Sequence, residues 1–201
     1  MFESLIGKHK TEIDTPALLL YMDAVERNIH KMANFFSNKT CKLRPHVKTH
    51  KLPLIAHKQI EAGAIGITCA KLEEARIFLE SGIENILIAN EIVGNTKIQK
   101  LVHLSTYGDL IVCVDQFENA RDISEVAGKF GKKVNVLVEV DVGLNRCGVK
   151  PGKPALELVQ GIAPLKHLEF RGLMGYEGGL FIKDPREKKR KCEECNHLLV
   201  E

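Results

Sequence analysis

The stretch that decides the fold runs from Val134 to Val142 and reads VNVLVEVDV. Successive side chains of a β-strand point to opposite faces, so the even-numbered valines share one face. The other face carries Asn135, Leu137, Glu139 and Asp141. In a barrel the helices cover the outside of the sheet, so the valine face is expected to point outward and the polar face inward.

Short apolar runs alternate with helical patterns along the whole chain. The predicted strands cover residues 17–22, 42–48, 65–70, 85–90, 110–115, 134–142 and 168–174. The predicted helices cover residues 24–36, 53–61, 72–80, 95–105, 120–128, 154–162 and 184–200. Strands that alternate with helices in this way are typical of βα units around a parallel sheet.

Two α/β architectures use such units, the doubly wound nucleotide-binding fold and the TIM-type (β/α)8 barrel. No glycine-rich loop of the form G-x-G-x-x-G or G-x-x-x-x-G-K-[ST] follows a predicted strand, so the nucleotide-binding fold lacks its usual support. The polar strand face favours the barrel. From residue 42 onward the chain offers about six βα units, whereas a full barrel has eight. We therefore expect a barrel that is truncated after about six units.

The composition is that of an ordinary soluble protein, with 201 residues, 44% of them hydrophobic, and a net charge of +3. This charge is too small and too dispersed to indicate nucleic-acid binding. No apolar run approaches the roughly 20 residues that span a membrane, and the first residues lack a secretory signal pattern. We expect a cytoplasmic protein without a disulfide framework. Four of the six cysteines lie in or beside apolar runs and are expected to be buried.

A second informative stretch runs from Leu43 to Lys51, reads LRPHVKTHK and holds five cationic or imidazole side chains in nine residues. Read as a strand, it carries on one face Lys42, Arg44, His46 and Lys48, and on the other Leu43, Pro45 and Val47. Pro45 removes a ladder hydrogen bond, so an irregular strand is expected. Lys48, at the end of this strand, is the leading candidate for covalent catalysis by an amine. The alternative is a basic strand on a solvated sheet face.

Two further strand ends carry candidate binding residues. Arg146 projects from the glycine-containing turn after the strand at 134–142, where a guanidinium could hold an anionic oxygen. Tyr176 follows the strand at 168–174 between glycines, where its ring could stack on a planar cofactor. The alternatives are a surface arginine in an ordinary βα turn and an ordinary loop tyrosine.

Metal-type spacings are weak in this chain, and no metal ligand is predicted. Cys192 and Cys195 have C-x-x-C spacing, but they lie on a charged predicted helix without a second cysteine pair. His46 and His50 are four residues apart, but Pro45 argues against the helix that would bring them to one face.

An ordered series of motifs resembles the D-threonine aldolase / D-serine dehydratase group. These motifs are TPALLL (15–20), RPHVKTHK (44–51), GITCAKLEEA (66–75), ANEIVG (89–94), VCVD (112–115), VLVEVDVGLNRCGV (136–149) and GLMGYEG (172–178). The group consists of fold-type III enzymes of pyridoxal phosphate (PLP), built on the alanine-racemase-like barrel. The motifs NEIVG and VEVDVG-x-x-RCGV favour the aldolase branch.

The resemblance implies a role for each candidate residue. Lys48 matches the lysine that bonds covalently to PLP, Arg146 matches the arginine at the phenolate oxygen, and Tyr176 matches the aromatic on the pyridine ring. Arg44 and His46 match the motif residues beside the lysine. The resemblance also assigns the strand near the N-terminus to a C-terminal β-domain that this chain lacks. The implied organisation is therefore an N-terminal segment (1–22) and an incomplete PLP-binding barrel (23–201).

The implied function is a PLP-dependent lyase that cleaves small D-3-hydroxy amino acids to glycine and an aldehyde. A D-serine dehydratase-like ammonia-lyase is the alternative within the group. A non-catalytic PLP-binding protein, or an inactive truncated form, is the alternative of another class. Ala70 and Glu177 depart from the family pattern, which leaves the substrate open. The resemblance further implies a homodimer for the full-length form and a divalent metal (Mn, Mg or Zn) whose ligands lie in segments absent from this chain.

Overall fold

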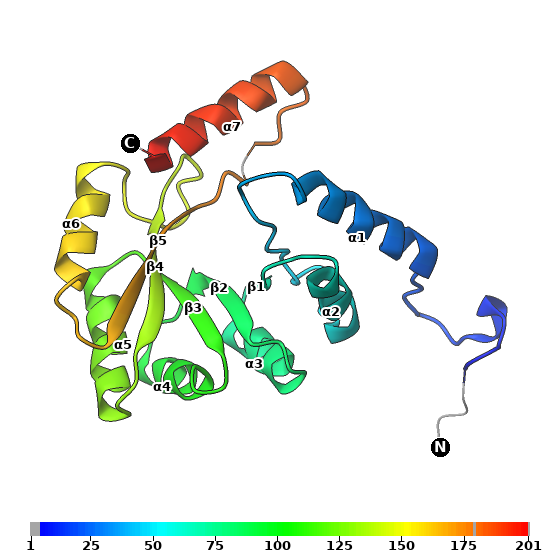
Figure 1. The fold of residues 1–201 in the computed structure, drawn as a ribbon, viewed down its shortest axis with the longest axis horizontal. Coiled ribbons are helices and arrows are strands. Elements are labelled where there is room, and N and C mark those ends of the chain that lie inside the picture. The colour runs from blue at the N-terminus through cyan, green and yellow to red at the C-terminus, as the bar shows by residue number, and fades with distance from the viewer. Residues whose placement is uncertain (1–4, 179, 201) are drawn as a thin grey trace.

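The computed structural model describes residues 5–178 and 180–200, and its centre is a five-stranded parallel sheet (Figure 1). The strands lie side by side in chain order: β1 (Ile67–Cys69), β2 (Asn85–Glu91), β3 (Asp109–Val114), β4 (Val134–Val140) and β5 (Leu168–Gly175). The helices between them are α3 (Leu72–Glu80), α4 (Asn95–Leu104), α5 (Phe117–Lys129) and α6 (Lys153–Ile162). The parallel βα architecture predicted from the sequence is confirmed.

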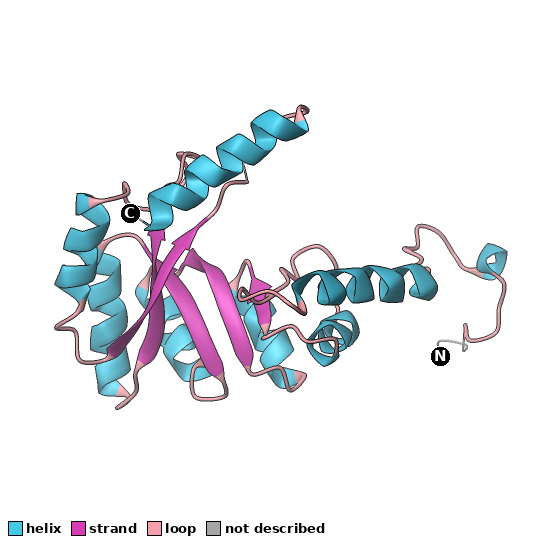
Figure 2. Cartoon of the chain, turned by 45° about the horizontal axis from the view of Figure 1, so that its top comes forward, coloured by secondary structure: helices cyan, strands magenta, loops and turns pink. Residues whose placement is uncertain are grey.

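The helices between the strands pack on one side of the sheet, and the main core lies between these two layers (Figure 2). The even-numbered valines of β4 are almost fully buried in this core, with exposed fractions of 2% or less. On the opposite face of β4, Asn135 and Leu137 remain half-buried. The predicted division of this strand into a helix-covered face and an inward face is therefore confirmed.

The segment before the sheet differs from the predicted strand at 42–48. It makes one isolated bridge to β1, between His46 and Thr68, in which the Thr68 N–H donates to the Pro45 carbonyl at 2.8 Å. Residues 47–50 then form a turn, closed by a 2.8 Å bond from the Lys51 N–H to the Val47 carbonyl. The missing donor of Pro45 accounts for the short pairing. Lys48 thus lies in a turn and not in a strand.

The apolar side of this segment behaves as predicted. Leu43 and Pro45 line a hollow between α1 (Met22–Phe36) and α2 (Pro53–Glu61), and Val47 is fully buried in the core. With the His46 bridge taken as the first strand, the chain forms six βα units, the last of which is completed by α7 (Pro185–Val200).

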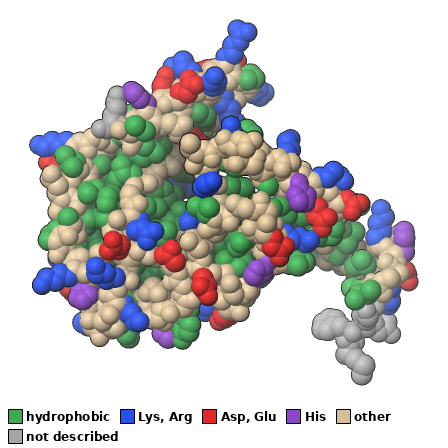
Figure 3. Space-filling model, viewed as in Figure 1, with side chains coloured by type: hydrophobic (Ala, Val, Ile, Leu, Met, Phe, Trp, Pro, Cys, Tyr) green, Lys and Arg blue, Asp and Glu red, His purple; other side chains and the backbone are tan. Residues whose placement is uncertain are grey.

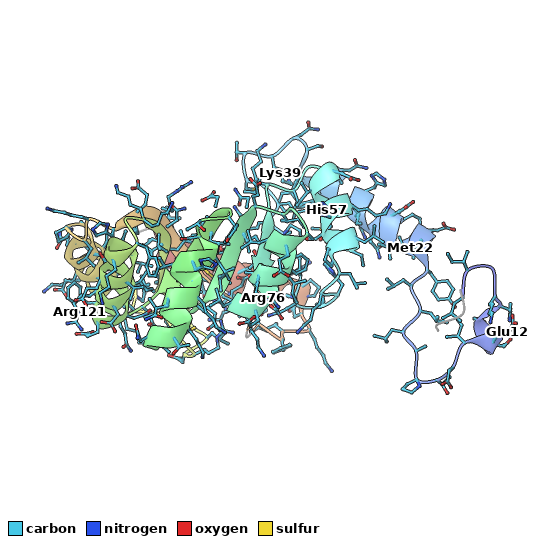
Figure 4. The ribbon with its side chains drawn as sticks, turned by 90° about the horizontal axis from the view of Figure 1, so that it is seen from below. Glu12, Met22, Lys39, His57, Arg76 and Arg121 are labelled. Carbon is cyan, nitrogen blue, oxygen red and sulfur yellow. The ribbon has the colours of Figure 1, made fainter. Side chains whose placement is uncertain are left out.

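The strand predicted at 17–22 does not form. Residues 17–21 have neither helical nor strand structure, α1 begins at Met22, and Leu18 is fully exposed. An extended segment becomes a strand only beside a partner strand, and none of the described strands pairs with it. The N-terminal part, with the 3-10 helix η1 (Lys10–Glu12), projects away from the sheet, so that Glu12 and Arg121 lie at opposite ends of Figure 4. Its assignment to a separate β-domain remains a prediction.

Two surface features complete the fold. α7 lies beyond the carboxyl ends of β4 and β5 (Figure 1). Hydrophobic side chains gather where β4 and β5 lie (Figure 3). Phe170 and Leu173, each 41% exposed, line the hollow beside β5 and α6. None of the helices in the described part of the chain is long and apolar enough to cross a membrane.

The cysteines follow the prediction in part. All six are free thiols, and Cys69 and Cys113 are buried. Cys41 is exposed because the residues around it precede the paired segment, and Cys147 is half-buried at the inner face of the sheet. Two cysteines are therefore buried, where four were expected.

Candidate cofactor site

A cavity of about 240 Å³ opens at the carboxyl ends of the strands, where barrel enzymes place their chemistry. Its lining combines the His46 bridge and the turn after it, the ends of β1, β2 and β5, and the loop after β4. The lining residues are His46, Lys48, Ala70, Ala89, Asn90, Arg146, Met174 and Tyr176. Four of the five predicted site residues therefore meet in one cavity, although they come from segments far apart in the sequence.

Four larger hollows have a different character. Two have mainly apolar linings, one of about 410 Å³ between α1 and α2 and one of about 610 Å³ beside β5 and α6. The other two, of about 300 and 390 Å³, lie beneath α7 and beside the start of α3. None of the four brings a lysine, an arginine and an aromatic ring together. The smaller cavity is therefore the candidate site on chemical grounds.

Two cations flank the ring of Tyr176 in the cavity. The Lys48 ammonium nitrogen lies 5.8 Å from the ring centroid, and the guanidinium carbon of Arg146 lies 5.2 Å from it. Both distances are within the range of cation–π attraction. The ring thus holds an amine and a guanidinium at the mouth of the same cavity.

His46 is the neutral polar group beside Lys48. Burial lowers the pKa of His46, and the positive charge of Lys48 lowers it further. The Lys48 backbone N–H donates to the Nδ1 atom of His46 at 3.3 Å. In the neutral imidazole the proton then lies on Nε2, which can donate a hydrogen bond to a ligand.

Arg44 is the predicted site residue that the cavity does not include. Its Nη1 atom donates to Asn85 Oδ1 at 2.5 Å, and Asn85 donates to Asp109 Oδ2 at 3.2 Å. Asn135 completes this polar layer with a 2.7 Å bond to Asp109 Oδ1. Because Asn85 and Asp109 are the first residues of β2 and β3, this layer lies at the opposite end of the sheet from the cavity. The geometry gives Arg44 a structural role there and does not support contact with a cofactor.

The loop that presents Arg146 is fixed by the carboxylate of Asp141. Oδ1 of Asp141 accepts the backbone N–H groups of Gly143 at 3.0 Å and Asn145 at 2.9 Å, and Oδ2 binds the Lys150 ammonium at 2.7 Å. These contacts, that with Lys150 foremost, lower the pKa of Asp141 to about 2. A loop tied at both ends to one buried carboxylate holds the Arg146 backbone in place.

A buried acidic cluster below Arg146 was not predicted from the sequence. Glu139 Oε1 lies 3.8 Å from Arg146 Nη2 and accepts the Cys147 thiol at 2.9 Å. Glu91, from the end of β2, brings a second carboxylate, and one side-chain donor atom from each of the three residues lies within 4.8 Å of the others. The alternation of β4 does point Glu139 inward, but no sequence pattern links it to Glu91 across β3.

Comparison with known families gives the site its context. The family described as "Alanine racemase, N-terminal domain" matches residues 20–199. The chain belongs to this family. Within the alanine racemase N-terminal family, aldolases and a dehydratase of D-3-hydroxy amino acids are similar to this chain, which confirms the predicted relationship.

Three known proteins are similar to the chain over most of its length. The D-threonine aldolase of Arthrobacter sp is 38% identical over 189 residues, which cover 94% of this chain and 49% of the relative. The D-threo-3-hydroxyaspartate dehydratase of Delftia sp. is 34% identical, with 90% and 48% covered. The crystal structure of the D-threonine aldolase from Filomicrobium marinum superposes with a TM-score of 0.91 at 43% identity, covering 94% of this chain and 52% of that one. The chain thus spans about half the length of these members of the alanine racemase N-terminal family.

Proposed function

We propose that this chain binds PLP through Lys48 and forms part of a lyase that cleaves D-3-hydroxy amino acids. The observation that carries this proposal is the convergence of Lys48, Arg146 and Tyr176 on one cavity at the carboxyl ends of the strands. Its support is the similarity to D-threonine aldolases, at 38% and 43% identity. Sequence and geometry therefore lead to the same three residues.

The residues of the cavity fit PLP in their chemistry. PLP, when bound, supplies an aldehyde carbon that bonds to an amine and a ring that accepts electrons. Lys48 provides the amine of the cavity, and Tyr176 provides an aromatic face beside it. Arg146 provides a permanent cation with several donors, which suits a phenolate oxygen.

The chain's own groups have distinct tasks in this proposal. Arg146 holds an anionic oxygen and, through its contact with the ring of Tyr176, orients a planar ligand toward Lys48. His46 remains neutral at pH 7 because its pKa is lowered, so it adds a donor but no charge near the amine. Ala70 lines the cavity, so its departure from the family pattern bears on the substrate, whereas Glu177 lines a different hollow beneath α7.

The divalent metal implied by the resemblance does not fit this cavity. Its lining offers one imidazole and no carboxylate, whereas Mg²⁺ and Mn²⁺ prefer several oxygen ligands. In this proposal the metal ligands belong to the half of the related enzymes that this chain does not span.

A dehydratase is the second candidate, favoured by the 34% identity to a D-threo-3-hydroxyaspartate dehydratase. The two reactions need the same lysine, so the products must separate them. We would incubate the purified chain and PLP with D-threonine or D-serine, with and without Mn²⁺. Glycine plus acetaldehyde selects the aldolase, and pyruvate plus ammonia selects the dehydratase.

The same experiment includes the remaining alternatives. PLP binding without turnover of either substrate would support a PLP-binding role without catalysis. Absence of both binding and turnover would contradict the proposal. Turnover that persists in Lys48→Ala would also contradict it, because the assigned amine would then be dispensable.

A further inference from the structure

Glu139 is the most deeply buried acidic side chain near the cavity. Its residue is 2% exposed and lies on the inward face of β4. Glu91 approaches it across β3, since Glu91 pairs with Cys113 and Cys113 pairs with Leu137. Two carboxylates from non-adjacent strands therefore share one buried space.

Each of these carboxylates has one oxygen without a hydrogen-bond partner among the described residues. These oxygens are Oε1 of Glu91 and Oε2 of Glu139, and both are inaccessible to solvent. Two ionised carboxylates in such a space repel each other, and unpaired buried oxygens cost additional free energy. A single proton between the two groups removes both penalties, because a protonated carboxyl donates to the ionised one.

The other oxygen of Glu139 is oriented toward the cofactor cavity. Oε1 accepts the Cys147 thiol at 2.9 Å and lies 3.8 Å from Arg146 Nη2. Arg146 in turn contacts the ring of Tyr176. A continuous series of contacts therefore leads from the buried pair to the face of the cavity that contains Lys48.

We propose that Glu91 and Glu139 share one proton and that the pair positions Arg146 for the cofactor by presenting a single, fixed negative charge to its guanidinium. This inference rests on the proposed function, in which Arg146 binds a cofactor oxygen. With both carboxyls protonated, Arg146 would lose its ionic partner. With both ionised, the two buried carboxylates would repel each other, and the side chain of Glu139 would no longer be fixed.

The surrounding groups are consistent with a retained proton. Burial raises the pKa of Glu91 to about 7, and the charges of Glu139 and then Asp115 add to this rise. Burial also raises the pKa of the Cys147 thiol to about 11 and that of the Cys113 thiol still higher, so both sulfurs remain neutral. Arg146 is the cation that faces the pair, and Asp115 is engaged by the Gly148 N–H at 3.0 Å.

A metal ion is the competing occupant of the cluster. Glu91, Glu139 and Cys147 are close enough together to surround a cation. However, such a cation would lie beside the guanidinium of Arg146, and the thiol already donates its proton to Glu139. A proton satisfies the same oxygens without bringing two cations together.

Infrared spectroscopy of the purified chain with isotope-labelled glutamate tests the shared proton without any cofactor. We expect the carbonyl band of a protonated glutamic acid at a pH between 4.5 and about 7. The band should be lost in Glu91→Gln and retained in Glu61→Gln, a control at an exposed residue at the end of α2. Absence of the band in the unmodified chain, or one equivalent of bound metal by elemental analysis, would overturn the inference.

Stability gives a second readout that does not depend on PLP. A raised pKa means that the folded state holds a proton that the unfolded state releases, so the free energy of unfolding should fall as the pH rises from 4.5 to about 7. Glu91→Gln should remove this slope, and Glu61→Gln should retain it. An unchanged slope in Glu91→Gln would overturn the assignment of the proton.

The positioning role is tested by PLP titration. Glu139→Gln removes the charge that faces Arg146 and should weaken PLP binding about tenfold. Glu91→Gln keeps a donor toward Glu139 and should weaken binding less. Equal effects of the two variants, or none in Glu139→Gln, would overturn the positioning role. If the unmodified chain does not bind PLP at all, the proposed function fails, while the infrared and stability results still decide the shared proton.

Discussion

Arg146 and Tyr176 come from different βα loops, yet the Arg146 guanidinium carbon lies 5.2 Å from the centroid of the Tyr176 ring. The Lys48 ammonium nitrogen lies 5.8 Å from the same centroid. The ring is therefore the common contact of the two cations that the proposed function requires. Both contacts are made by the ring. A substitution that removes the whole ring should therefore have a larger effect than one that removes only the hydroxyl.

Replacing Tyr176 tests this role of the ring. Tyr176→Ala removes the aromatic face and should weaken PLP binding about three- to tenfold. Tyr176→Phe keeps the face and should bind nearly as the unmodified chain does. Titration with PLP, followed by visible absorbance, measures both. Equal losses in the two variants would show that the hydroxyl, and not the ring, is what matters.

Replacing Arg44 should lower stability, whereas replacing Arg146 should weaken PLP binding. Arg44→Ala breaks the bond to Asn85 in the half-buried polar layer and should lower the free energy of unfolding by about 1–3 kcal/mol. Arg146→Ala removes a half-exposed cation from the cavity and should weaken PLP binding with little loss of stability. Urea unfolding and PLP titration of both variants give the comparison. Loss of PLP binding in a stably folded Arg44→Ala variant would show that Arg44 contributes to the cofactor site.

Gly148 is a sharp test of the loop that carries Arg146. Its φ of +96° disfavours a side chain, and a Cβ atom there would lie 2.7 Å from the backbone nitrogen of Asp141. Gly148→Ala should therefore destabilise the chain by about 2–4 kcal/mol and weaken PLP binding. Gly131→Ala is the matched control, since Gly131 has φ +61° but open space around its Cα atom, and it should cost about 1 kcal/mol. Similar losses in both variants would contradict the close packing of this loop.

Asp141 should give the fold an acid-sensitive component. Its pKa in the folded state is lowered from 3.8 to about 2, so its contribution to stability is fully present above 3.8 and is lost as the pH falls toward 2. Asp141→Asn should flatten this part of the stability curve. Asp122→Asn, at an exposed residue of α5, should leave the curve unchanged. Urea unfolding at a series of acidic pH values measures the slopes, and a curve that Asp141→Asn leaves unchanged would contradict the role of this carboxylate.

Much of the fold could be predicted because it depends on local periodicity. The helices at 53–61 and 72–80 form over the predicted residues, and the valine face of β4 is buried as the alternation indicates. Two predictions depend on pairing partners and are wrong. Residues 17–22 form no strand because none of the described strands lies beside them, and Lys48 lies in a turn because Pro45 limits pairing to a single bridge.

The candidate site was predictable only in part, for a physical reason. Lys48, Arg146 and Tyr176 could be found because each follows a strand, and parallel strands end at the same edge of a sheet. Arg44 would lie on the same strand face as Lys48, but it lies at the opposite end of the sheet from the cavity, bound to Asn85. Alternation specifies the face of a strand and not the position along it. The pairing of Glu91 with Glu139 depends on register across β3, which no local pattern encodes.

The central claim is that Lys48 is the amine that binds PLP, and borohydride reduction tests it most directly. The purified chain would be mixed with PLP, reduced, digested and mapped by mass spectrometry. We predict that the PLP mass is found on the peptide that contains Lys48, that Lys48→Ala loses it, and that Lys42→Ala, at an exposed lysine of the same segment, retains it. Labelling that is spread over several lysines, or that persists on another residue in Lys48→Ala, would contradict the account.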